Sequence, residues 1–276
     1  MKPMKKRLTQ INENDLRDEI FKNVMNKQAT ATISLEDDGI VCGIEHLKRR
    51  AISLGLKVDK TAKDGSHIRR GGIVARVRGN PKQIAIGEDA LIGLIAKTSG
   101  IATAASKAVE LSNGRFKIVS GAWKKMPPAI KDKVREALTI AGVGVRIVDE
   151  RFVYLDKNYV RLLGGIREAL LAVNKMRNRT KVVQLKGETC DIAQEAVEAT
   201  NYGAQVIVID TGKRSDIKSV VTVLNRIGIR GQVRIGFAGN VEINDIRKFR
   251  DSGIDILEIG RAIIDAPLLD MKMNVN

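Results

Sequence analysis

The feature that most constrains the fold is a regular alternation of strand-like and helix-like segments that begins at Phe116. Short apolar runs rich in Val and Ile alternate with segments whose apolar residues recur at helical spacing. Strictly alternating strands and helices with apolar strands predict a parallel sheet. The predicted strands are Phe116–Ser120, Arg151–Leu155, Lys181–Leu185, Ala204–Asp210, Val233–Phe237 and Ile254–Gly260. Six or seven such strands predict an incomplete α/β barrel of the TIM type.

The last two of these units share an unusual ending. Val233–Asn240 is an apolar run that ends in small residues, and Val241–Arg250 follows it with a helical period. Ile254–Gly260 repeats the arrangement ahead of a second helix start. Two neighbouring strands that end in glycine above helix starts leave backbone N–H groups pointing outward, and an anion such as a phosphate fits there.

In α/β barrels the active site gathers at the carboxyl ends of the strands. The candidate positions by this rule are Ser120–Lys125, Asp156–Asn158, Gln184–Lys186, Asp210, Phe237–Asn240 and Gly260–Arg261. Asp210 has two interpretations: it faces sugar hydroxyls or a metal ion, or it caps the following helix, which is common for Asp at a strand end. His46 and His67 both precede the barrel, so no histidine base is expected at the strand ends.

The segments before Phe116 do not show this regular alternation of strands and helices. A short helix is predicted over Asn14–Met25, and Ala29–Leu35 and Ile40–Ile44 are predicted to form a hairpin around an Asp-Gly turn. Ile73–Arg78 alternates as a strand, and Gly87–Ser112 is a long helix with small residues at its centre. We therefore expect an α+β domain over residues 1–112, a barrel over 113–270, and a tail over 271–276 that returns to the first domain.

A formal net charge of +16 raises the question of nucleic-acid binding. The basic residues are spread over many helices among Glu and Asp, and aromatic residues make up only 3% of the chain, so a stacking platform for bases is not indicated. A basic surface with a site for an anionic substrate, or a charged surface of the kind found in heat-adapted proteins, explains the charge as well.

The expected location is the cytoplasm. The two cysteines, Cys42 and Cys190, have neither metal-ligand spacing nor a disulfide pattern, which fits a reducing compartment. The basic start, residues 1–7, is followed by no apolar region, so neither a signal peptide nor an anchor is expected. No run reaches membrane-spanning length.

The order of motifs along the chain resembles the quinolinate phosphoribosyltransferase family. The motifs that carry this resemblance are Thr98–Thr103, Gly121–Pro127, Val206–Asp210, Phe237–Asn240, Ile259–Arg261 and Ala266–Asp270. The resemblance covers essentially the whole chain. It implies a homodimer, or a dimer-based oligomer, in which the partner's N-terminal domain completes each site. It also implies phosphoribosyl pyrophosphate with Mg²⁺ as the donor, and an aromatic acid as acceptor, quinolinate giving nicotinate mononucleotide for NAD biosynthesis.

Carried over position by position, the resemblance names the site residues. Lys124, Arg146 and Asp210 take catalytic roles, with Asp210 also on the metal side. The acceptor is assigned to the side chains of Trp123, Lys125, Lys157, Gln184 and, from the partner subunit, the position of Asp89. A slip of one residue in the comparison would place the family's lysine at Asp156 instead of Lys157. The 5′-phosphate is assigned to Ala238, Gly239, Asn240, Gly260 and Arg261.

Several of these positions depart from the family pattern. Trp123 stands where the family has an arginine that clamps a carboxylate, and Asp89 reverses the charge of another arginine. Gln184 replaces a glutamate, and Val145 replaces a histidine. Each lost bidentate contact to a carboxylate weakens binding by about 1.5–3 kcal/mol, so these changes argue against quinolinate as the preferred acceptor. Trp123 stacks on a ring with fewer carboxylates, or it is a surface aromatic.

Three functions are therefore compared. The first is a phosphoribosyltransferase of this family that keeps the donor site, on the strength of Lys124, Arg146, Asp210, Gly239 and Gly260. The second is a different enzyme on the same scaffold that acts on another phosphate-bearing substrate. The third is a non-catalytic binder of anions or nucleic acid, suggested by the charge alone. We favour the first.

Overall fold

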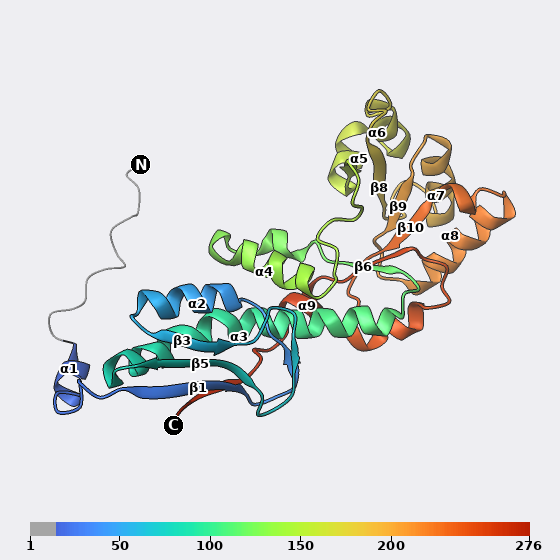
Figure 1. Cartoon of the computed structure of the whole chain (residues 1–276). Coiled ribbons are helices and arrows are strands. Elements are labelled where there is room, and N and C mark those ends of the chain that lie inside the picture. Colours follow the sequence, from blue (N-terminus) through green and yellow to red (C-terminus); the bar gives the residue numbers. More distant parts are fainter. Residues whose placement is uncertain (1–14) are drawn as a thin grey trace, which may run out of the picture. The chain divides into compact units, whose positions relative to one another are not determined.

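The structure is a computed structural model that describes residues 15–276 and divides into two compact units. The first unit contains the described residues up to Lys97 together with Leu269–Asn276, and the second is Thr98–Leu268. Among the described residues, no helix is both long and apolar enough to span a membrane. Figure 1 follows the chain through both units from blue to red.

The first unit is built on a four-stranded antiparallel sheet with the order β12-β1-β5-β3. Its strands are β1 (Ala29–Leu35), β3 (Lys57–Thr61), β5 (Ile73–Gly79) and, from the end of the chain, β12 (Met271–Val275). A short helix, α1 (Leu16–Ile20), precedes the sheet. Alternate residues of β1 and β5 point into a core of aliphatic side chains that includes Ile33, Leu35 and Val77.

Two helices complete this unit. The apolar face of α2 (Ile44–Ser53) carries Ile44, Leu47 and Ala51 into the core. The long helix α3 (Pro81–Ser112) starts in the first unit and runs on into the second. Its start is a reciprocal cap: the side chain of Asn80 accepts from the N–H of Gln83, and the side chain of Gln83 accepts from the N–H of Asn80, each at 2.9 Å.

The predicted hairpin of Ala29–Leu35 with Ile40–Ile44 is wrong. Both edges of β1 are taken by β5 and β12, and the two-residue strand β2 (Gly39–Ile40) pairs with β4 (His67–Ile68) instead. The reason lies in the turn, because Asp38 accepts a hydrogen bond of 2.8 Å from the N–H of Arg70 and so draws this segment to the distant strand. Asn14, the expected cap of the first helix, lies outside the described residues, and Asp15 caps α1.

The second unit contains the predicted incomplete barrel, a curled sheet of six parallel strands with the order β6-β11-β10-β9-β8-β7. The strands are β6 (Lys117–Val119), β7 (Phe152–Leu155), β8 (Thr180–Leu185), β9 (Val206–Ile209), β10 (Arg234–Phe237) and β11 (Ile256–Glu258). In the described part of the chain no ladder joins the edge strands β6 and β7, so the barrel stays open. All the strands run the same way and end at one rim.

Helices and 3₁₀ turns connect these strands. Of these, α7 and α8 lie on the outer side of the sheet, as Figure 1 shows, and α7 contacts β8 and β9. The helices are α4 (Pro128–Ile140), α5 (Lys157–Leu163), α6 (Ile166–Ala172), α7 (Ile192–Asn201), α8 (Arg214–Arg226) and α9 (Arg261–Ile264), with 3₁₀ turns η1 (Ala122–Lys125), η2 (Arg230–Gln232) and η3 (Ile243–Phe249). The helical segment between β7 and β8 is divided into α5 and α6, because Gly164 and Gly165 adopt positive φ between them. The helix expected over Val241–Arg250 is the 3₁₀ segment η3.

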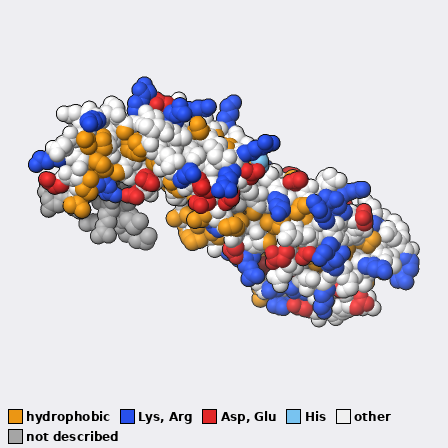
Figure 2. Space-filling model, turned by 90° about the horizontal axis from the view of Figure 1, so that it is seen from below, with side chains coloured by type: hydrophobic (Ala, Val, Ile, Leu, Met, Phe, Trp, Pro, Cys, Tyr) orange, Lys and Arg blue, Asp and Glu red, His pale blue; other side chains and the backbone are white. Residues whose placement is uncertain are grey.

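The charged surface is mixed. Figure 2 shows the Lys and Arg side chains dispersed over the visible face, with Asp and Glu among them. Many are paired, such as Lys117 with Asp149 at 2.7 Å and Arg161 with Glu188 at 2.6 Å. On the face shown, the Lys and Arg side chains of residues 15–276 do not form the continuous basic stripe that a nucleic-acid backbone requires.

Acid sensitivity is predicted for the amino-terminal rim of the barrel. There, Arg234 at the start of β10 donates to the carboxylate of Glu150, and Thr180 donates to it at 3.1 Å. These contacts, with Arg234 first, lower the pKa of Glu150 from 4.5 to about 2. A depressed pKa stabilises the fold above pH 4.5 and loses that contribution as the pH falls towards 2. We expect Glu150→Gln to unfold with a smaller pH dependence in this window, measured by circular dichroism.

The control is the neighbouring exposed carboxylate Asp149, which pairs with Lys117 at the surface. Asp149→Asn should leave the slope of stability against pH close to that of the wild type in the same window. An equal change of slope in both variants would contradict the role assigned to Glu150.

Candidate active site

A cavity of about 910 Å³ opens at the carboxyl rim of the six-stranded sheet. Its walls come from the ends of all six strands and from the loops that follow them. Its lining includes Gly121, Trp123–Lys125, Val145–Ile147, Asp156–Lys157, Ala238–Glu242 and Gly260–Ala262, together with Tyr154, Gln184, Asp210 and Glu258. The cavity therefore lies at the carboxyl ends of the parallel strands, where this topology predicts an active site.

The alternation of the strands decides which side chains reach the inner face. Val182, Val206, Val208 and Ile256 pack together inside the curl of the sheet. Two residues further along the same strands, the side chains are polar: Gln184 follows Val182, Asp210 follows Val208, and Glu258 follows Ile256. The apolar layer thus ends in a polar layer at the mouth of the cavity.

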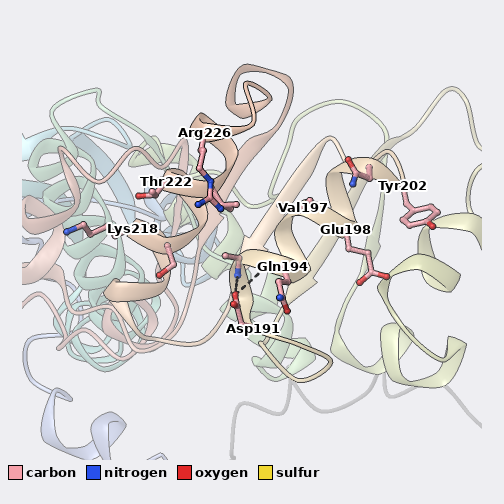
Figure 3. A pocket seen from close by; sticks show the side chains of 12 residues that line it. Asp191, Gln194, Val197, Glu198, Tyr202, Lys218, Thr222 and Arg226 are labelled. Atoms are coloured by element: carbon pink, nitrogen blue, oxygen red, sulfur yellow. Dashed lines mark hydrogen bonds between the residues drawn. The ribbon is translucent and has the colours of Figure 1, made fainter.

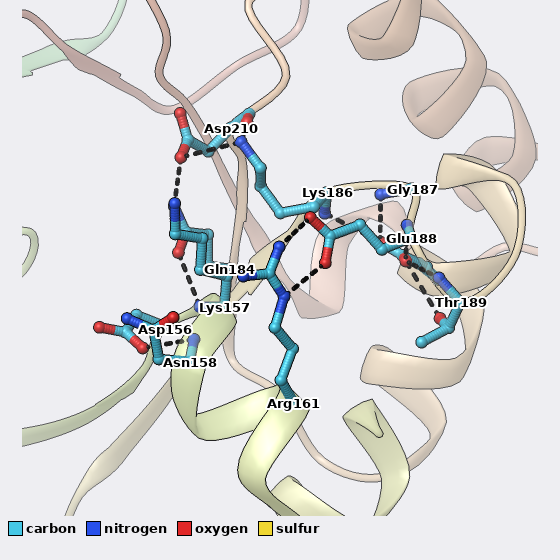
Figure 4. Close-up of polar contacts among 11 residues, drawn as sticks. Asp156, Lys157, Asn158, Arg161, Gln184, Lys186, Gly187, Glu188, Thr189 and Asp210 are labelled. Atoms are coloured by element: carbon cyan, nitrogen blue, oxygen red, sulfur yellow. Dashed lines mark hydrogen bonds and ion pairs between the residues drawn. The ribbon is translucent and has the colours of Figure 1, made fainter. Parts of the chain in front are cut away.

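Asp210 is the centre of the polar layer (Figure 4). Its carboxylate accepts from the side-chain amide of Gln184 and from Lys186 Nζ at 3.4 Å, and Lys186 also donates to its backbone carbonyl. The oxygen of the Gln184 amide accepts from the N–H of Lys157 at 2.8 Å. The capping interpretation of Asp210 is wrong, because α8 begins after Lys213 without a side-chain cap.

The loop that carries Lys186 is held by a buried carboxylate from α7. Glu195 is only 2% exposed, and its two oxygens accept from the backbone N–H groups of Lys186, Gly187, Glu188 and Thr189 at 2.8–3.0 Å. The hydroxyl of Thr189 donates to it as well, at 3.0 Å. Five donors on one carboxylate fix the path of this loop, and hence the position from which Lys186 reaches Asp210.

The glycine-rich loop after β10 packs tightly against the loop after β9. Gly239 has φ +113°, and a Cβ there would lie 2.7 Å from the backbone nitrogen of Gly212. Asn240 also has a positive φ, +50°. Successive residues in this region of conformational space turn backbone N–H groups into a concave surface that suits an anion.

Gly239→Ala is predicted to lower the free energy of unfolding by about 2–3 kcal/mol, because the added Cβ meets backbone atoms at a φ that disfavours side chains. Gly228→Ala is the matched control. It also adds a Cβ at positive φ, +74°, but into open space, so about 1 kcal/mol is expected. Denaturant unfolding measures both, and equal losses would contradict the crowding at Gly239.

The opposite wall of the cavity comes from the turn η1. The indole N–H of Trp123 donates to the carbonyl of Val145 at 3.1 Å, and the guanidinium of Arg135 lies 4.7 Å from the centre of the ring. One face of Trp123 is therefore covered by Arg135. Arg146 stacks on Phe152 at 5.0 Å and contacts the carbonyl of Glu150. Lys124 and Lys125 are exposed in this turn.

Sequence reasoning missed two members of the inner layer, Tyr154 and Glu258. Burial, followed by the charges of Glu258 and Asp210, raises the pKa of Tyr154. Burial and the charge of Asp210 raise the pKa of Glu258, against the opposing effect of Lys124. Each residue lies two positions after an apolar residue of its strand, Phe152 or Ile256, that faces inward in the folded sheet. The strand period would have found both residues once the inner face was known.

Of the thirteen residues expected from the sequence, the structure places twelve around this cavity. They are Trp123, Lys124, Lys125, Arg146, Lys157, Gln184, Asp210, Ala238, Gly239, Asn240, Gly260 and Arg261. Asp89 belongs to α3 in the first unit, where it pairs with Arg17 at 2.6 Å. Its role towards a partner subunit stays a prediction.

The donor set of the cavity is compatible with Mg²⁺ that arrives with a phosphorylated substrate. Among residues 15–276, no group of three or more Asp, Glu, His or Cys side chains is arranged to hold a metal ion. Mg²⁺ commonly uses one or two carboxylates and takes its other ligands from substrate phosphates and water. Asp210 is placed to supply such a carboxylate at the rim.

A second cavity, of about 720 Å³, lies between α7 and α8 on the outer side of the barrel (Figure 3). Its walls include Gln194, Glu198, Lys218, Thr222 and Arg226. No strand end reaches it, and its charges are mixed along two exposed helix faces. The catalytic candidate is therefore the cavity at the rim of the sheet.

Comparisons with known proteins identify the family of the chain. The model of the "Quinolinate phosphoribosyl transferase, C-terminal domain" matches residues 101–274, and that of the N-terminal domain matches residues 15–99. A probable nicotinate-nucleotide pyrophosphorylase [carboxylating] of Archaeoglobus fulgidus is 27% identical over 255 residues, which cover 91% of this chain and 96% of the relative. The human nicotinate-nucleotide pyrophosphorylase [carboxylating] is 26% identical, with 89% and 82% covered.

Solved structures show the same fold. The nicotinate-nucleotide pyrophosphorylase from Pyrococcus furiosus superposes with a TM-score of 0.81 at 22% identity, over 94% of this chain and 72% of that one. The corresponding structure from Francisella tularensis gives a TM-score of 0.80 at 20% identity, over 97% and 92%.

Proposed function

This chain belongs to the quinolinate phosphoribosyltransferase family, and we propose from this premise that it transfers a phosphoribosyl group from phosphoribosyl pyrophosphate to the ring nitrogen of a pyridine carboxylate. The observation that carries the proposal is the cavity at the strand ends, which joins a glycine-lined concave loop, a carboxylate and several cations. In the family the reaction forms nicotinate mononucleotide from quinolinate on the way to NAD.

The donor's 5′-phosphate is assigned to the loops at Ala238–Asn240 and Gly260–Arg261. Backbone N–H groups at positive φ and the cation of Arg261 suit a phosphate there. Asp210 lies between this loop and Gln184, so it is available to the ribose hydroxyls and to Mg²⁺. Mg²⁺ would neutralise the charge on the departing pyrophosphate.

The reaction needs positioning and charge more than a strong base. The lone pair of the ring nitrogen forms a bond to C1′ of the sugar while the C1′–O bond breaks, and pyrophosphate leaves with the electron pair. Lys124 and Arg146 would hold the acceptor carboxylate, and Lys186 would keep Asp210 in place. Preorganised charges of this kind supply most of the rate enhancement in such sites.

The assembly is also part of the proposal. A homodimer, in which Asp89 of one subunit approaches the cavity of the other, would follow the family pattern. Size-exclusion chromatography with light scattering measures the oligomer, and a monomer at micromolar concentration would contradict this arrangement.

The function is tested by incubating the protein with phosphoribosyl pyrophosphate, Mg²⁺ and quinolinate, while nicotinate mononucleotide is followed by chromatography. Calorimetry with phosphoribosyl pyrophosphate alone tests the donor half independently. Donor binding without product from quinolinate would keep the transferase and change the acceptor. Absence of donor binding would overturn the proposal and favour another enzyme on this scaffold.

A further inference from the structure

Glu258 places a negative charge at the junction of the two halves of the cavity. It is the last residue of β11 and precedes Gly260 by two positions. Its strand lies between β6, which leads into the Trp123 wall, and β10, which leads into the glycine loop. A ring that enters the cavity beside Lys124 therefore contacts Glu258 before it reaches the loop Ala238–Asn240.

Gly121 leaves room for this carboxylate. A Cβ at position 121 would lie 2.9 Å from Glu258 Oε1, so only glycine fits without a shift. The backbone N–H of Gly121 opposes the rise in the pKa of this carboxylate. Gly121, at the start of the acceptor wall, therefore lies directly against Glu258.

Both negatively and positively charged side chains act on Glu258. Asp210, Tyr154, Lys124 and Lys125 line the same cavity as Glu258. The charge of Asp210 raises the pKa of Glu258, and the charges of Lys124 and Lys125 lower it. One acceptor carboxylate would have Lys124 and Arg146 as partners, since both line the cavity. A second carboxylate directed at Glu258 would meet a like charge in a partly desolvated site.

We propose that Glu258 selects the acceptor, and that the site prefers a pyridine ring with one carboxylate and a neighbouring N–H donor to a dicarboxylate. An N–H group directed at Glu258 makes a charge-assisted hydrogen bond where a carboxylate is repelled. The proposal rests on the proposed function for its reaction. Transfer to such a ring forms the N–C1′ bond, releases pyrophosphate and loses no carboxylate.

The test uses two acids that share the 3-carboxylate and differ at the adjacent position. Quinolinate carries a second carboxylate there, and 2-aminonicotinate carries an amino group. Calorimetry should show 2-aminonicotinate binding at least about tenfold more tightly than quinolinate. Glu258→Gln keeps the side chain's size and removes the charge, so the ratio of the two affinities should fall by about tenfold or more.

Two controls keep the result specific. Glu242→Gln removes an exposed charge from the rim of the same cavity and should change the ratio by less than about threefold, because water screens that position. Glu258→Ser repeats the loss of charge with a smaller side chain, in case the glutamine variant folds poorly. Circular dichroism verifies the fold of each variant.

Tighter binding of quinolinate to the wild type, or a ratio that Glu258→Gln leaves unchanged, would overturn the selection by Glu258. Failure of both acids to bind would overturn it too. A loss of phosphoribosyl pyrophosphate affinity in Glu258→Gln with an unchanged ratio would assign the carboxylate to the ribose instead. Donor binding to the wild type, measured in parallel, separates these results from a failure of the proposed function.

Discussion

Glu195→Ala is expected to lower the free energy of unfolding by about 3–5 kcal/mol. The carboxylate is buried and accepts five hydrogen bonds from the loop after β8, none of which an alanine replaces. Gly187, Glu188 and Thr189 are exposed, so their N–H groups regain water, and this recovery keeps the loss below the sum of five charged hydrogen bonds. Denaturant unfolding followed by circular dichroism measures the difference.

The same substitution should also reduce phosphoribosyl transfer. Lys186 belongs to the loop that Glu195 holds, and its side chain extends to Asp210. A loosened loop would therefore displace this contact. Glu198→Ala removes a carboxylate one turn further along α7 and should change stability by no more than about 0.5 kcal/mol. A Glu195→Ala protein as stable as Glu198→Ala would show that the hydrogen bonds to the loop contribute little.

The barrel could be predicted from the sequence because its strands and helices alternate with distinct periods. Every predicted strand of the barrel overlaps an observed one, since a buried parallel strand is an uninterrupted apolar run in the sequence. The prediction of a hairpin near the start was wrong for the opposite reason. The partner of Ala29–Leu35 is decided by contacts with residues far away in the chain, such as Met271–Val275, and local turn residues carry no information about them.

Candidate residues in loops were easier to find in the sequence than those within strands, although Gln184 of β8 was found through the family resemblance. Glycine and charged residues after a strand stand out in the sequence, as Gly239 and Asp210 do. Glu258 and Tyr154 lie within strands, and their direction follows from which face is inside, a property of the folded sheet. Glu195 lies in the first turn of α7, and nothing local reveals that a loop from the preceding strand folds over it.

Asp210→Asn is expected to lower kcat/KM for phosphoribosyl transfer by about 10²- to 10³-fold, because it removes the charge at the centre of the polar layer. The amide keeps the size of the side chain, but it presents an N–H donor to Gln184 or Lys186 where both now find an acceptor. Binding of phosphoribosyl pyrophosphate should also require more Mg²⁺ in this variant, since the site loses a carboxylate.

Asp156→Asn is the matched control for this loss of activity. Asp156 follows β7 at the same rim and caps α5 through hydrogen bonds to Asn158 and Tyr159. Asparagine caps helices as well as aspartate does, so the variant should remain folded. Steady-state kinetics should then show a much smaller loss than in Asp210→Asn. Equal losses would mean that the cavity responds to its total negative charge, and Asp210 would lose the particular role that its contacts with Gln184 and Lys186 indicate.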